Sequence, residues 1–63
     1  MSEYSFTDRD GDTFTASHIG EGMMRLRAVY GAKDAERVDI DFLAADLDSI
    51  IRVMQRAAEV AAS

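Results

Sequence analysis

The chain has no cysteine, no proline and no tryptophan, and it has a single histidine among its 63 residues. Without cysteine there are no disulfides and no thiolate metal site, and one histidine offers little for zinc. A chain this short buries only about 60% of the surface that its unfolded form exposes, so small domains usually need further support. With disulfides excluded, we expect any such support to come from oligomerisation.

Long apolar runs are also missing. No stretch approaches the roughly 20 apolar residues of a membrane span, and residues 1–10 lack the basic and apolar regions of a secretory signal. We therefore expect a cytoplasmic protein without membrane contact. The net charge of −5 argues against bulk attraction to nucleic acid or anionic lipid. Because 48% of the residues are apolar, the chain is not a disordered tail.

The strongest periodic pattern runs from residue 43 to residue 61. At 3.6 residues per turn, the apolar residues of this segment fall on one stripe, and the polar residues fall on the opposite side. The stripe consists of Leu43, Leu47, Ile50, Ile51, Met54, Ala57, Ala58 and Ala61. This pattern predicts one amphipathic helix that needs an apolar surface to lie on.

Four segments before the helix alternate apolar and polar residues, at 4–7, 13–17, 23–30 and 37–42. A polar loop is expected at 31–36, and all connections are short, which favours an antiparallel meander. We predict a single α+β domain over residues 1–63, a four-stranded β-meander with one C-terminal α-helix packed on one face (ββββα). The predicted core of the sheet is Tyr4, Phe6, Phe14, Ala16, Met24, Leu26, Tyr30, Val38, Ile40 and Phe42.

The register of the first hairpin can be predicted from burial. A two-residue turn would place Phe6 and Phe14 on opposite faces, whereas a three-residue loop at 9–11 places both on one face. We therefore predict the three-residue loop, with Gly11 in the left-handed position of a type I turn plus bulge.

Asp8, Asp10 and Asp12 alternate as the first ligands of a calcium loop do. Such a loop needs glycine at its sixth position and glutamate at its twelfth, and Thr13 and Ile19 stand there. A solvated hairpin turn is the favoured interpretation, and we expect no metal and no cofactor.

Arg25, Arg27 and Arg37 are expected on the sheet face that the helix does not cover. They could bind phosphate or an acidic partner, or they could pair across strands with Asp39 and Asp41. The same face has no aromatic side chain on which a nucleic-acid base could stack, so cross-strand pairing is favoured.

Apolar residues outside the predicted core are candidates for a partner surface. Met23 and Val29 fall on the open sheet face, and Val53 and Val60 fall on the flank of the helix. Grouped exposed apolar residues can mark a protein-binding site.

No catalytic residues are predicted. His18 follows Ser17 directly, and neighbours on a strand point to opposite faces, so they do not form a catalytic couple. Gly20 and Gly22 are not followed by a helix start, which argues against a phosphate loop.

The string Thr-Asp-Arg-Asp-Gly-Asp-Thr at 7–13, the alternating middle and the C-terminal helix together resemble short uncharacterised proteins of actinobacteria and their phages. The resemblance brings no assigned activity, and it leaves open a phage-type accessory or anti-defence role.

The function that we expect is that of a small non-enzymatic protein-interaction module, self-associating as a homodimer or regulating or inhibiting a larger partner. Its candidate surface comprises Arg25, Arg27, Arg37, Met23, Val29, Val53 and Val60. The alternative is a nucleic-acid-binding protein that uses the open sheet face.

Overall fold

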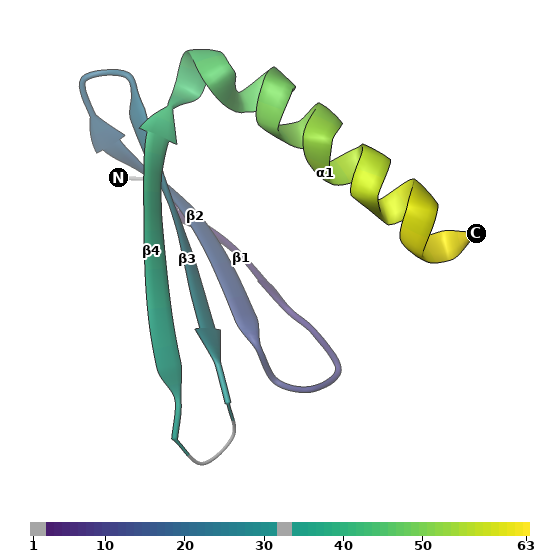
Figure 1. The fold of residues 1–63 in the computed structure, drawn as a ribbon. Helices are drawn as coiled ribbons and strands as arrows, with labels where there is room; N and C mark the ends of the chain where they lie inside the picture. Colours follow the sequence, from purple (N-terminus) through teal and green to yellow (C-terminus); the bar gives the residue numbers. More distant parts are fainter. Residues whose placement is uncertain (1–2, 32–33) are drawn as a thin grey trace.

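The computed structural model describes residues 3–31 and 34–63. One antiparallel sheet with the order β1-β2-β3-β4 is followed by a short 3-10 turn and a C-terminal helix (Figure 1). The elements are β1 Glu3–Thr7, β2 Thr13–Gly20, β3 Met23–Tyr30, β4 Glu36–Leu43, η1 Ala44–Asp46 and α1 Leu47–Ala62. The predicted ββββα order is confirmed.

The first hairpin has the predicted register, in which Phe6 lies opposite Phe14 and Tyr4 opposite Ala16. The Asp8 N–H donates to the Asp12 carbonyl over 2.9 Å, and the Gly11 N–H donates to the Asp8 carbonyl over 3.1 Å. Gly11 has a φ of +86°, which only glycine adopts at little cost. This hydrogen-bond pattern confirms the three-residue loop with a type I turn and a bulge.

The second hairpin has a two-residue turn, and the strand before it is longer than predicted. Glu21 and Gly22 form the turn with φ values of 53° and 72°, as the type I′ turn requires at both central positions. The strand before it continues to Gly20 instead of ending at 17, with a bulge at Ile19. Of the predicted loop at 31–36, residues 32 and 33, Lys33 among them, lie outside the described residues.

The helix begins four residues later than predicted. Leu43 is the last residue of β4 and pairs with Met23, and the Ala44 N–H donates to the Gly22 carbonyl over 2.8 Å. The backbone at 43–44 is thus engaged by the sheet, and α1 starts only at Leu47. Asp41 lies inside β4 and accepts a hydrogen bond from Arg25.

The predicted packing of the helix across the sheet is wrong for the single chain. Figure 1 shows α1 leaving the end of β4 and standing apart from the strands. Every residue from Ile51 to the end of α1 is exposed, and α1 makes no extensive contact with any strand among the described residues. The pairing of Leu43 and the hydrogen bond from Ala44 extend the strand and so delay the start of the helix.

The dimensions of the chain reflect this open arrangement. The radius of gyration is 13.2 Å, whereas a compact domain of this length has about 10.6 Å. None of the described residues is buried. Among them, no helix is long and apolar enough to cross a membrane.

Candidate partner-binding surface

One face of the sheet is almost entirely apolar. Cross-strand pairs place side chains of all four strands there, because paired residues share a face. This surface, called the apolar sheet face below, comprises Tyr4, Phe6, Phe14, Ala16, His18, Met24, Leu26, Ala28, Tyr30, Val38, Ile40 and Phe42. Its rim is wide open, since Tyr4 is 73% exposed and Phe6 is 64% exposed.

The helix carries a second apolar surface, the apolar helix sector. It comprises Leu47, Ile50, Ile51, Val53, Met54, Ala57, Ala58, Val60, Ala61 and Ala62. At 100° per residue these side chains span about 200° of the helix circumference, twice the roughly 100° of an ordinary surface helix. Val53 and Val60 are 68% and 75% exposed.

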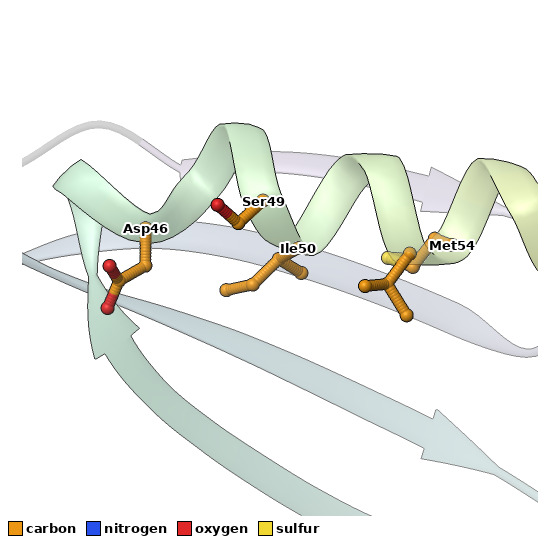
Figure 2. A pocket seen from close by; sticks show the side chains of 5 residues that line it. Asp46, Ser49, Ile50 and Met54 are labelled. Atoms are coloured by element: carbon orange, nitrogen blue, oxygen red, sulfur yellow. The ribbon is translucent and has the colours of Figure 1, made fainter.

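The two surfaces lie on the same side of the molecule. Ala44, just before the helix, lines a hollow together with Tyr4, Ala16 and Met24 of the apolar sheet face. A further hollow of about 440 Å³ lies beneath the first turns of α1, lined by Asp46, Ser49, Ile50, Val53 and Met54. Figure 2 shows the labelled side chains of Ile50 and Met54 on the helix side that is turned toward the strands. The apolar sheet face and the apolar helix sector are thus neighbours, and both remain open.

The accessible surface measures how much cover is missing. The chain exposes 5374 Å², whereas a folded monomer of 6.9 kDa exposes about 4,000 Å². The excess is roughly 1,400 Å² per chain on the same scaling. The chain therefore exposes more surface than a compact monomer of its mass, and large apolar side chains contribute to it.

The opposite sheet face is polar and internally paired. Arg25 donates two hydrogen bonds to Asp41, from Nε to Oδ1 at 2.7 Å and from Nη2 to Oδ2 at 3.0 Å. Arg27 donates to Asp39 in the same way, from Nε to Oδ1 at 2.9 Å and from Nη2 to Oδ2 at 3.4 Å. Hydroxyl pairs at Ser5–Thr15 and Thr7–Thr13 continue the pattern toward β1. Arg25 and Arg27 therefore follow the cross-strand interpretation.

These ion pairs shift the titration of their members. The hydrogen bond from Arg25 lowers the pKa of Asp41, and the hydrogen bond from Arg27 lowers the pKa of Asp39. The same hydrogen bonds raise the pKa of each arginine. Both carboxylates therefore stay ionised at neutral pH, and each neutralises its arginine.

The remaining candidate residues divide between the polar sheet face and the apolar helix sector. Arg37 is largely exposed and only 4.0 Å from Asp39, while Met23 and Val29 are half-buried within the polar face. Val53 lines the same hollow as Ile50 and Met54. The flank that we separated from the main stripe is thus continuous with it.

Asp8 has a structural role in the turn of the first hairpin. The Asp8 Oδ1 accepts hydrogen bonds from the backbone N–H groups of Asp10 and Asp12, at 2.9 and 3.0 Å. This carboxylate closes the turn, as aspartate does at such positions. Across residues 3–31 and 34–63, no group of three or more metal-ligating side chains is placed to hold an ion.

Sequence reasoning assigned the aromatic and aliphatic residues of the sheet to the core of the chain itself, and so missed that they form an open surface. The signal for this was the width of the apolar helix sector. One sheet covers one side of a helix, and Val53 and Val60 extend the sector beyond that side.

Comparison of the chain with family models, with curated proteins and with solved structures finds no match.

Proposed function

We propose that this chain is a small non-enzymatic protein-interaction module that associates with a second copy of itself. The observation that supports the proposal most strongly is the pair of uncovered apolar surfaces on one side of the molecule. Both surfaces follow the periodicity of their own element, so each is built for burial.

The area available fits a permanent dimer. If each chain buried its excess of roughly 1,400 Å², the pair would bury about 2,800 Å² in total. Obligate homodimers bury 2,000–5,000 Å² or more, and their interfaces are apolar like a domain core. The apolar sheet face and the apolar helix sector supply such a composition.

A dimer formed through these surfaces leaves the polar sheet face and the edges of the sheet for other contacts. The outer edges of β1 and β4 carry unpaired backbone groups, which suit strand addition by a larger partner. Met23 and Val29 add apolar contact area on the polar face. A regulatory or inhibitory role toward such a partner is part of the proposal.

Nucleic-acid binding is not favoured by the geometry of the arginines. The guanidinium groups of Arg25 and Arg27 each already bind a carboxylate. A phosphate would therefore have to displace an existing bidentate pair.

Thermal unfolding at a series of protein concentrations tests the proposal. Because a dimer is stabilised by mass action, its midpoint should rise steadily with concentration. A midpoint that does not move over a hundredfold range of concentration would contradict self-association.

A further inference from the structure

The sheet is too wide for the helix that accompanies it. Four strands at about 4.8 Å spacing present a face roughly 19 Å across, and a helix covers about 10 Å of such a face. The described part of one chain supplies one α-helix, which has 16 residues. Full cover of the apolar sheet face therefore needs two helices.

The helix, in turn, carries more apolar surface than one sheet can cover. The sector of about 200° has a centre and two sides. The centre is formed by Ile50, Met54, Ala57 and Ala61; one side is formed by Val53 and Val60, and the other by Leu47, Ile51, Ala58 and Ala62. The hollow beneath α1 is lined by Val53 and also by Ile50 and Met54, so the side with Val53 and the adjoining part of the centre open toward it. Within residues 3–31 and 34–63, all three parts of the sector stay largely uncovered, because every residue of α1 from Ile51 onward is exposed.

A second copy of the chain satisfies both requirements at once. Resting on the proposed self-association, we propose that two copies form a three-layer sandwich, with a layer of two helices side by side between two sheets. Each helix then contacts its own sheet through Val53 and Val60, the partner's sheet through the side with Ile51, and the other helix through its centre. Its polar side, about 160° wide, faces solvent at the edge of the helix layer.

The lengths and side-chain sizes agree with this arrangement. A helix of 16 residues is about 24 Å long, and strands of eight residues are about 27 Å long, so each helix runs along nearly the whole sheet. Ala57 and Ala61 lie at the centre of the sector one turn apart, and small side chains allow two helices to approach closely. The two polar sheet faces, with their arginine–aspartate pairs, form the outer surfaces.

Single-cysteine variants test the helix contact directly, because the natural chain has no cysteine. Ala57→Cys places the thiol at the centre of the sector, and Gln55→Cys, two positions away, places it on the polar side. After treatment with a short bis-maleimide, the Ala57→Cys chain should run as a covalent dimer on a denaturing gel. The Gln55→Cys chain should stay single.

A second measurement tests the sheet contact. In a sample mixed from isotope-labelled and unlabelled copies, isotope-filtered nuclear Overhauser spectra should show the Ile51 methyl groups of one copy near the Phe6 or Phe14 ring of the other. A dimer without this contact, or with equal cross-linking at the two cysteine positions, would overturn the three-layer arrangement while leaving self-association standing. A monomer under all conditions would overturn both.

Discussion

Phe6 lies directly opposite Phe14 across the first hairpin, and both rings stand on the uncovered sheet face. Phe6 is 64% exposed and Phe14 is 41% exposed. Aromatic pairs across strands normally belong to a core, where each ring buries 150–250 Å². Here the two rings are paired, but no second layer of the described chain packs on them. This arrangement is expected of one half of a core that two chains share.

The substitution Phe6→Ala measures whether that cover exists in solution. Under the dimer arrangement the ring is buried, so its loss should lower the free energy of unfolding by about 3–5 kcal/mol. An exposed ring would change it by less than about 0.5 kcal/mol. Urea unfolding at one fixed protein concentration distinguishes the two, with Ser5→Ala on the polar face as the control. A change as small as that of the control would contradict a covered ring.

Val60→Asp tests the flank of the helix, where the native side chain is 75% exposed in the single chain. We expect the substitution to weaken the dimer by at least about 2 kcal/mol, because it removes an apolar contact and buries a charge. Arg56→Asp, on the polar side of the same helix, should leave the dimer intact. Dissociation constants from analytical ultracentrifugation measure both effects. Equal dissociation constants for the two variants would show that Val60 stays uncovered when the dimer forms.

Acid should destabilise the fold through the two ion pairs of the polar face. The pKa of Asp39 and the pKa of Asp41 are lowered by their arginine partners from the ordinary value of 3.8. Their stabilising contribution is therefore complete above pH 3.8 and is lost as the pH falls through the lower folded-state values. Asp41→Asn should flatten the fall in melting temperature below pH 4. The control is a substitution of the exposed Asp34. If the melting temperature of Asp41→Asn falls with acid as steeply as that of the control, the Arg25–Asp41 pair does not contribute to acid destabilisation.

The second hairpin offers a stabilising change. Glu21 has a φ of 53°, a conformation that costs a non-glycine residue about 1–2 kcal/mol and that asparagine tolerates better. Glu21→Asn creates the preferred Asn-Gly type I′ turn and should raise the free energy of unfolding by about 0.5–1 kcal/mol. Glu21→Gln removes the same charge without favouring this conformation and is the matched control. If both variants gain equally, charge and not backbone conformation is the cause.

Local elements were predictable from the sequence because their determinants are local. The placement of Phe6 and Phe14 on one face required a three-residue loop, and Gly11 supplied the residue for it. The end of β4 was not predictable in this way. Leu43 fits both the alternation of the strand and the period of the helix, and only the pairing with Met23 decides between them.

The packing of the helix was mispredicted for a different reason. An apolar stripe shows that a helix needs a partner surface, but it does not show which chain supplies that surface. We assumed that the sheet of the same chain would be enough. The width of the apolar helix sector, with Val53 and Val60 beyond the main stripe, was the sequence feature that argued for a second partner. The arginine–aspartate pairing, in contrast, followed from simple alternation along β3 and β4.

The most direct test of a shared core is the molar mass in solution, measured by light scattering on a sizing column at micromolar concentration. We expect a single species with twice the 6.9 kDa mass of the chain. The substitution Ile40→Asp on the apolar sheet face should convert this species to monomer, and Thr15→Asp on the polar face should not. A folded species of 6.9 kDa with cooperative unfolding would contradict a shared core.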